Sequence, residues 1–210
     1  APMAQYFEVH PENPQARLVS QVASVVRSGG VVVYPTDSGY AFGWAIGHKT
    51  AQDRIRLIRR LEDSHDFTLV CRDLSEIATY AKVGNTAYRL MRGATPGPYT
   101  FILKATHEVP RRLQDPKRRT IGLRVPDNRI ARAILDALGE PLMSSSLVLP
   151  GDEMPLTDPE EIRDRVGKQV DLIVDGGFCG YEPTTVVDLQ GDVPEVVRRG
   201  KGDPAPFETP

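Results

Sequence analysis

The sequence predicts an α/β (α+β) fold, a single domain in which a mixed, twisted sheet is flanked by helices. Short β-branched or apolar runs alternate with segments whose apolar residues recur at helical spacing. The 18 glycines and 18 prolines punctuate these segments along the whole chain instead of collecting in one linker. Because the last three expected strands are separated by segments too short for helices, we expect a mixed sheet and not a purely parallel one.

Four helices have clear start or stop signals. The first begins after Asn13-Pro14 and ends at Gly29-Gly30, the second is capped by Thr50, the third ends at Gly139, and the fourth begins with Asp158-Pro159. The first three carry apolar faces: Leu18, Val22, Val25 and Val26; Ala51, Ile55 and Ile58; and Ile130, Ile134, Leu135 and Leu138.

Eight strands are expected between the helices. The first is the β-branched run 31–34, which should stop at Pro35. The others are expected at 67–71, 99–104, 120–125, 142–146, 171–174, 184–189 and 195–197.

Composition excludes several classes of protein. The 26 basic and 28 acidic residues give a net charge of −2, so no global basic field for nucleic acid exists. Two distant cysteines without a CxxC pattern argue against a disulfide scaffold or a structural zinc site.

The sequence has no apolar run of the roughly 18 to 20 residues that a membrane span needs, so we expect a cytoplasmic protein with no membrane partner. Ala1-Pro2 ahead of Met3 resembles an expression scar, which leaves residues 3–210 for the single domain.

Four hydroxyl-rich or glycine-rich segments stand at the ends of expected strands. They are 35–40, 95–100, 143–146 and 183–185. Ligands of open α/β sheets bind where loops leave strand ends, and such loops offer hydroxyls and backbone N–H groups to phosphate or carboxylate oxygens. Each segment alone also has the composition of an ordinary turn, so the prediction of a ligand site depends on their convergence.

Arginine supplies the charge for such a site. Arg124 lies inside the apolar run 121–126, where a charge is costly unless it is paired. It either faces a substrate or pairs with an aspartate, and the sequence leaves both open. Basic clusters at 111–112, 117–119 and 198–201 are typical of solvated faces.

The common catalytic templates are absent. The sequence contains no Walker-type phosphate loop, HExxH, GxSxG or GxGxxG motif, so no metal site is predicted and no catalytic residue can be assigned.

Five segments together closely resemble the YrdC family. They are Tyr34-Pro35-Thr36-Asp37-Ser38-Gly39-Tyr40-Ala41-Phe42-Gly43, Pro96-Gly97-Pro98-Tyr99-Thr100, Gly122-Leu123-Arg124-Val125-Pro126, Asp175-Gly176-Gly177 and Pro183-Thr184-Thr185-Val186-Val187-Asp188. Their order and spacing match over about residues 10 to 200. Segments 67–74 and 109–113 resemble the YciO branch in particular.

The resemblance implies a strongly twisted α/β sheet with a concave basic face linked to binding of nucleotides and double-stranded RNA. It also implies a nucleotidyltransferase reaction, in which L-threonine, bicarbonate and ATP with Mg²⁺ give threonylcarbamoyl-adenylate and pyrophosphate. That product feeds the modification of tRNA adenosine 37. By resemblance, the threonine contacts are Thr36, Arg124, Thr184 and Thr185, with Tyr40 lining the cleft; the ATP contacts are Arg59, Thr100, Ser144, Ser146 and Arg198.

Two departures from the synthase branch lower the activity that we expect. Where that branch has Lys-x-Arg-Pro, this chain reads Arg59-Arg60-Leu61-Glu62, then Asp66-Phe67; where it has Ser-x-Asn, this chain reads Ser146-Leu147-Val148. An apolar valine cannot replace the hydrogen bonds of an asparagine. Loss of these contacts is worth on the order of a hundredfold in rate.

Two alternatives to a threonylcarbamoyl-adenylate synthase are open. One is an RNA-binding module without catalysis, whose partner is tRNA or double-stranded RNA, and the other is an enzyme that acts on another adenylated substrate.

Overall fold

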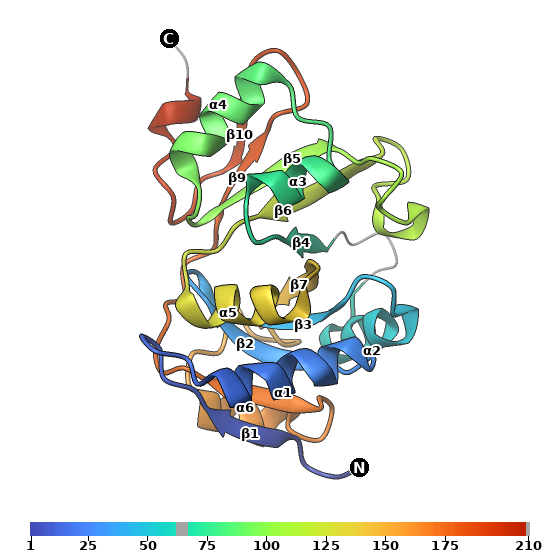
Figure 1. The fold of residues 1–210 in the computed structure, drawn as a ribbon, viewed down its shortest axis with the longest axis vertical. Helices are drawn as coiled ribbons and strands as arrows, with labels where there is room; N and C mark the ends of the chain where they lie inside the picture. The colour runs from blue at the N-terminus through green and yellow to red at the C-terminus, as the bar shows by residue number, and fades with distance from the viewer. Residues whose placement is uncertain (62–66, 209–210) are drawn as a thin grey trace. The chain divides into compact units, whose positions relative to one another are not determined.

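The computed structural model describes residues 1–61 and 67–208 (Figure 1). Within those ranges lie ten strands and six α-helices, which confirms the α/β class. Glu62 and Asp66 of the altered motif fall outside the described residues. None of the helices in the described ranges is long and apolar enough to cross a bilayer. The chain forms two compact units: unit 1 comprises Ala1–His65 and Asn128–Tyr181, and unit 2 comprises Asp66–Asp127 and Glu182–Pro210.

The strands of unit 1 run in the order β1-β8-β2-β3-β7. Pairing is parallel from β1 to β8 and from β8 to β2, and antiparallel from β2 to β3 and from β3 to β7. Therefore β2, β7 and β8 end, and β3 begins, at the same end of the strands, called here the unit 1 edge. The strands are β1 (Gln5–Glu8), β2 (Val32–Thr36), β3 (Gly39–Ala45), β7 (Leu142–Ser146) and β8 (Leu172–Asp175).

The strands of unit 2 run in the order β4-β6-β5-β9-β10. Here β4 is parallel to β6 and β5 to β9, whereas β6–β5 and β9–β10 are antiparallel. As a result β4, β6 and β10 end, and β5 and β9 begin, at one end of the strands, the unit 2 edge. The strands are β4 (Thr68–Val70), β5 (Tyr99–Lys104), β6 (Thr120–Arg124), β9 (Thr185–Asp188) and β10 (Glu195–Arg198).

Helices cover the strands and complete the cores. In unit 1, α1 and α5 pack against each other and against β2 (Figure 1). Tyr34 of β2 and Phe42 and Trp44 of β3 are fully buried. In unit 2, α3 packs on α4. The helices are α1 (Ala16–Arg27), α2 (Lys49–Arg59), α3 (Leu74–Tyr80), α4 (Asn85–Ala94), α5 (Arg129–Leu138) and α6 (Pro159–Val166), with 3₁₀ turns at Arg111–Leu113 and Ala205–Phe207.

Capping explains why two of the predicted helices begin where they do. The Asp158 side chain accepts a hydrogen bond from the Glu160 N–H, and Pro159 occupies the first turn as expected. The Asn128 side chain accepts from Ala131 N–H at 3.0 Å, and Gly139 takes a left-handed conformation with φ 76° after the last residue of α5. The predicted apolar face of α5 is buried.

Four sequence expectations were wrong. The strand at 31–34 does not stop at Pro35, because β2 runs through Pro35 to Thr36 and pairs with β3. The strands β1 and β3 were not predicted; β3 is buried throughout, so its sequence lacks the polar alternation that would mark a strand. Thr50 does not cap α2, whose preceding residue is His48. Leu18 and Val25 of the predicted face of α1 are only partly buried, and the buried face instead includes Val19 and Ala23 beside Val22 and Val26.

The two cysteines are both free, as expected. Cys71 is buried, and burial raises the pKa of its thiol well above the ordinary value. Cys179, expected to be buried too, is only partly covered.

Ile134 should be a sensitive probe of the unit 1 core, since its side chain is fully buried on α5. We expect Ile134→Ala to lower the free energy of unfolding by about 2 to 5 kcal/mol, because it leaves a cavity. Urea denaturation, monitored by circular dichroism, measures the change in the free energy of unfolding. The exposed neighbour Arg132 is the control, and Arg132→Ala should change stability by less than about 0.5 kcal/mol; equal losses in both variants would contradict the packing described.

Candidate functional site

The unit 1 edge gathers two of the four hydroxyl-rich segments. Thr36 ends β2, Tyr40 lies at the start of β3, and Ser146 ends β7 directly opposite Ala41. The backbone N–H of Leu147 donates to the Tyr40 carbonyl at 3.3 Å, which ties the exit of β7 to the start of β3. Two of the four predicted segments therefore meet within unit 1.

The hydroxyl of Thr36 is engaged within its own turn. It donates to the Gly39 carbonyl at 2.7 Å, accepts from the Ser38 N–H at 3.0 Å and lies 3.2 Å from the Ser38 hydroxyl. Thr36 is 3% exposed, whereas Asp37 and Ser38 are partly exposed. The turn is consequently rigid, and its accessible polar groups belong to Asp37 and Ser38.

Tyr40 fixes a second loop against this turn. Its hydroxyl donates to the Gly177 carbonyl at 2.6 Å and accepts from the Gly176 N–H at 3.1 Å. Burial raises the pKa of Tyr40 above its ordinary value, so the hydroxyl keeps its proton at neutral pH. Tyr40 therefore acts through its contacts with the loop that follows β8.

Ser144 and Ser146 differ in accessibility although both belong to β7. The Ser144 hydroxyl is buried, donates to the Phe42 carbonyl at 3.0 Å and shares a 2.8 Å hydrogen bond with the Tyr34 hydroxyl. Ser146 is exposed at the unit 1 edge. Of the two, Ser146 is better placed to meet a ligand.

Arg59 joins the two positions at which the chain departs from the synthase motifs. Its Nε donates to the Val148 carbonyl at 3.0 Å, and its Nη1 donates to the Ser145 hydroxyl at 2.7 Å. Burial lowers the pKa of Arg59 from its ordinary value, yet an arginine stays charged at neutral pH. The end of α2 thus places a positive charge beside the exit of β7 at the unit 1 edge.

The unit 2 edge gathers the other predicted residues. The Thr100 and Thr184 hydroxyls share a 2.8 Å hydrogen bond. Arg198 donates from Nη2 to the Thr184 hydroxyl at 3.0 Å and to the Thr184 carbonyl at 2.8 Å, and from Nε to the same carbonyl. Burial lowers the pKa of Arg198. One arginine and two threonines therefore form a connected polar group.

Thr185 secures the chain on the other side of this group. Its hydroxyl donates to the Gly202 carbonyl at 2.5 Å and accepts from the Gly200 N–H at 3.0 Å. A Cβ on Gly200 would lie 2.3 Å from the Pro183 carbonyl oxygen, so this close approach requires glycine. Thr185 is fully buried and holds the segment after β10 in place.

Arg124 ends β6 and is buried at the unit 2 edge. It is 6% exposed, and its register partner is Val70 at the end of β4. A buried guanidinium is costly in free energy unless charge or hydrogen bonds compensate it. Its position at a strand end agrees with either sequence reading, substrate contact or structural pair.

Two residues of the unit 1 edge were missed in the sequence. Ser145 holds Arg59 and was passed over between Ser144 and Ser146, although all three stand in the same serine run. Asp175 was quoted only as part of a motif, yet its Oδ1 accepts from the Gly177 N–H at 2.9 Å and its Oδ2 accepts from the Tyr6 hydroxyl at 2.7 Å. An acidic residue ahead of two glycines at a strand end is a signal that could have identified it.

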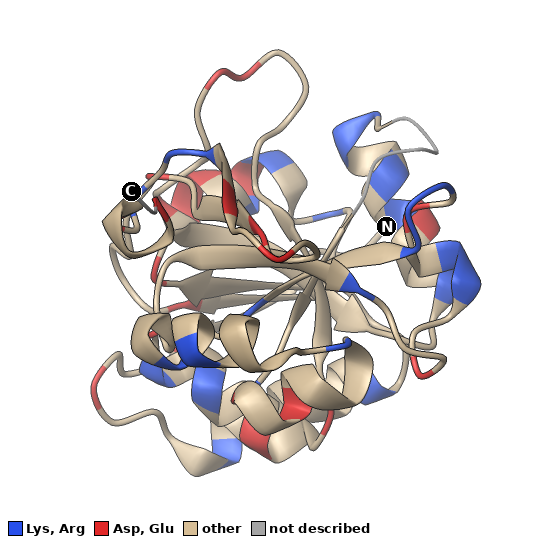
Figure 2. Ribbon diagram, turned by 90° about the horizontal axis from the view of Figure 1, so that it is seen from above, with Lys and Arg blue, Asp and Glu red and all other residues tan. Residues whose placement is uncertain are grey.

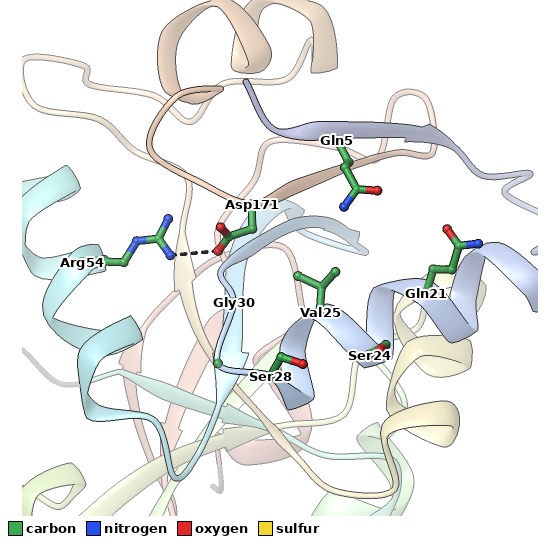
Figure 3. Close-up of a pocket in the computed structure, with 9 residues that line it drawn as sticks. Gln5, Gln21, Ser24, Val25, Ser28, Gly30, Arg54 and Asp171 are labelled. Carbon is green, nitrogen blue, oxygen red and sulfur yellow. Dashed lines mark hydrogen bonds and ion pairs between the residues drawn. The ribbon is translucent and has the colours of Figure 1, made fainter. Parts of the chain in front are cut away.

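A cavity of about 590 Å³ lies elsewhere in unit 1 (Figure 3). Gly30 lines it just before β2 begins, so it lies at the end of β2 opposite Thr36. Its charged groups satisfy each other: Arg54 donates to Asp171 at 2.8 Å, and the same carboxylate oxygen accepts from the Val31 N–H at 2.8 Å. This cavity is separate from the predicted ligand residues.

Within residues 1–61 and 67–208, no cluster of three or more His, Cys, Asp or Glu side chains could hold a metal ion. Mg²⁺ usually keeps several waters and is bound through substrate phosphates and one or two carboxylates.

Comparison with known proteins places the chain in a family. Residues 24–200 match the family model of the Sua5, YciO and YrdC proteins, described as "Telomere recombination". The chain belongs to this family. The uncharacterized protein YciO of Escherichia coli is 62% identical over 98% of this chain and its own full length. The crystal structure of E. coli YciO superposes with a TM-score of 0.94, at 61% identity, covering 98% of this chain and 100% of that one.

Two more distant relatives have a named activity or a bound ligand. A putative threonylcarbamoyl-AMP synthase of Methanocaldococcus jannaschii is 29% identical over 90% of this chain and 88% of its own. A crystal structure of P. abyssi Sua5 complexed with L-threonine has a TM-score of 0.85 at 23% identity, covering 93% of this chain and 57% of that one. The second likeness shows the shared fold.

Removing the Tyr40 hydroxyl tests the two hydrogen bonds that join it to the loop after β8, called here the Tyr40 clamp. We expect Tyr40→Phe to lower the free energy of unfolding by about 1 to 3 kcal/mol, because the Gly177 carbonyl and Gly176 N–H lose their partner. Tyr88 on α4 is 46% exposed, so Tyr88→Phe is the matched control and should stay within about 0.5 kcal/mol of the parent protein. Indistinguishable urea midpoints for the two variants would show that the clamp contributes nothing.

Proposed function

We propose that this protein is a nucleotide-binding enzyme of the threonylcarbamoyl-adenylate synthase type, which joins L-threonine, bicarbonate and ATP with release of pyrophosphate. One observation carries the proposal: in each unit, the hydroxyl and arginine side chains gather at a single end of the strands. The relationship to a putative threonylcarbamoyl-AMP synthase supports it. The product would serve tRNA modification.

The proposed chemistry needs positioning more than acid–base catalysis. The threonine amine attacks the carbon of bicarbonate, a C–O bond of bicarbonate breaks, and the oxygen leaves as water with a proton from the amine. A carbamate oxygen then attacks the α-phosphate, and pyrophosphate leaves with the electron pair of the broken P–O bond. Negative charge builds on the phosphate oxygens during the second step, so cations and N–H groups fixed in advance lower the barrier. At the unit 1 edge Arg59 is such a cation, since two hydrogen bonds hold it in place. Within unit 2, Arg198 is held by three. Mg²⁺ bound to ATP would partly neutralise the phosphates.

The structure also supports a reason for lower activity than the synthase branch. Arg59 has both Nε and Nη1 occupied by Val148 and Ser145. Bonding a phosphate with those nitrogens would require breaking contacts within the protein. Arg59 therefore lies at the unit 1 edge, where we propose that the ligand binds, but two of its three nitrogens already bond protein atoms.

Arg124 provides the test of the proposed function. We expect the parent protein incubated with ATP, L-threonine, bicarbonate and Mg²⁺ to form threonylcarbamoyl-adenylate, detected by mass spectrometry. Arg124→Met keeps much of the side-chain volume and should reduce product formation or threonine affinity by about 10- to 100-fold, because a charge-assisted contact is lost.

The exposed Arg132 on α5 offers the same substitution as a control, and Arg132→Met should match the parent protein. Circular dichroism checks that Arg124→Met is folded. No adenylate above an enzyme-free blank, together with no ATP binding by calorimetry, would remove the proposal.

Arg59 and Val148 should behave as a coupled pair in the same assay. We expect Arg59→Lys and Val148→Asn each to change the rate by less than about threefold, whereas the double variant gains about tenfold or more. A lysine frees the Val148 carbonyl and points a compact charge outward, while the asparagine supplies an amide for the nucleotide. A double-mutant cycle on initial rates measures the coupling; simple additivity would show that the two positions act independently.

A second candidate function, RNA binding without catalysis, is favoured by one segment of unit 2. Its five cations are all exposed: Arg111, Arg112, Lys117, Arg118 and Arg119. Arg118 donates to Asp188 at 2.5 Å, which retains part of the charge within the protein. Figure 2 shows Lys and Arg interspersed with Asp and Glu along the chain, in line with its net charge of −2.

Salt dependence distinguishes this second candidate. If phosphates bind the segment, the logarithm of the association constant for tRNA should fall linearly with the logarithm of salt concentration, by about 0.7 to 0.9 per contact. Filter binding at several salt concentrations measures the slope, and Lys117→Ala with Arg119→Ala should reduce it by about 1 to 2. Absence of any RNA affinity at low salt would eliminate RNA binding.

A further inference from the structure

The loop that follows β8, residues 176–181, is held at its base by four hydrogen bonds. Asp175 accepts from the Gly177 N–H and from the Tyr6 hydroxyl on β1. Tyr40 bonds the same loop through the Gly177 carbonyl and the Gly176 N–H. The base of the loop is thereby fixed to two strands, β1 and β3, as well as to β8.

The far end of the loop lies against the Thr36 turn. A Cβ on Gly39 would lie 3.1 Å from the Gly180 carbonyl oxygen and 3.8 Å from the Tyr181 Cα. At the base, a Cβ on Gly176 would lie 2.5 Å from Ile130 Cδ1 and 3.1 Å from Pro35 Cγ. The loop therefore crosses the turn with both ends in contact, and only the residues between them project outward.

Two aromatic side chains of the loop are exposed to water, Phe178 in the projecting part and Tyr181 at the far end. Phe178 is 73% exposed and Tyr181 is 46% exposed. Gly177 and Gly180, with φ of 81° and 99°, flank Phe178 and Cys179 and allow the tight path. Burying a phenylalanine is worth about 1.5 to 3 kcal/mol, so leaving one exposed on a fixed loop forgoes that stabilisation.

We propose that Phe178 stacks on the adenine ring of a nucleotide bound at the unit 1 edge. The assignment rests on the proposed function, and it names the contact that this function leaves open, the recognition of the base. A phenylalanine ring offers a flat apolar face on which a base can stack.

Spacing and charge favour a nucleotide as the occupant. The ends of β8 and β7 are separated by three strand intervals of the sheet, about 14 Å in all. Phe178 stands beyond the first of these ends, and Ser146 and the cationic Arg59 stand at the second. A ligand with an aromatic ring at one end and anionic phosphates at the other matches that order.

Tryptophan fluorescence can report the stacking directly. The single native tryptophan, Trp44, is fully buried, so Phe178→Trp introduces an exposed emitter at the site. We expect saturable quenching of Phe178→Trp by MgATP and by adenosine, and no quenching by magnesium tripolyphosphate, which lacks a ring. Val193→Trp, placed at a 66% exposed position between β9 and β10, is the matched control and should show no saturable quenching.

Calorimetry of the parent protein and Phe178→Ala completes the test. We expect the variant to bind MgATP about 5- to 140-fold more weakly, the range that base stacking gives, and to bind tripolyphosphate unchanged. A parent protein that binds MgATP while Phe178→Ala binds it equally well, or while Phe178→Trp is not quenched, would overturn the stacking alone. A parent protein that binds no MgATP would overturn the proposed function and the stacking together.

Discussion

Strand direction and register in unit 1 are the constraint on which the candidate site depends. Backbone hydrogen bonds pair β2 with β3 and β3 with β7, so Thr36, Tyr40 and Ser146 must reach the same end of the strands. A one-residue slip in either pairing would turn each side chain to the opposite face. Both faces of β2 and β3 are buried. A slip would therefore move the large side chains of Tyr34, Phe42 and Trp44 into close-packed surroundings of the wrong shape, which opposes it. Core packing therefore fixes the position of polar residues that contribute little to the core.

The polar residues at the two edges mostly bond to the protein itself. Thr36, Thr185 and Ser144 each bond a backbone carbonyl, and Thr184 lies between Thr100 and Arg198. Such satisfied networks hold their members in single geometries, which is what positioning a reactive substrate requires. Fewer groups are accessible: Asp37, Ser38 and Ser146 at the unit 1 edge, and the exposed ring of Phe178 on the loop that follows β8. This division separates residues that shape the edge from residues that could contact a ligand.

The sequence predicted the fold class and most strands because β-branched runs and helical periodicity are local signals. It predicted α5 well because an apolar stripe ends at Gly139, and α6 well because its Asp-Pro start carries its own capping group. It missed β1 and β3, because an edge strand of four residues and a fully buried strand both lack alternation. The contact from Arg59 to Val148 joins residues 89 positions apart, so no local pattern could reveal it. Phe178 was missed for a related reason: its proposed role depends on the exposure of its ring, which composition does not report.

Hydrogen–deuterium exchange with MgATP and L-threonine most directly tests the claim that the strand ends carry the ligand site. The account predicts slower amide exchange in the segments at the two edges, namely 36–40, 145–148 and 176–181 in unit 1, and 98–100, 184–186 and 198–201 in unit 2. The segments that line the cavity of Figure 3, 28–31 and 169–172, serve as the internal reference and should exchange as in the free protein. Protection confined to those cavity segments, with unchanged exchange at both edges, would contradict the account.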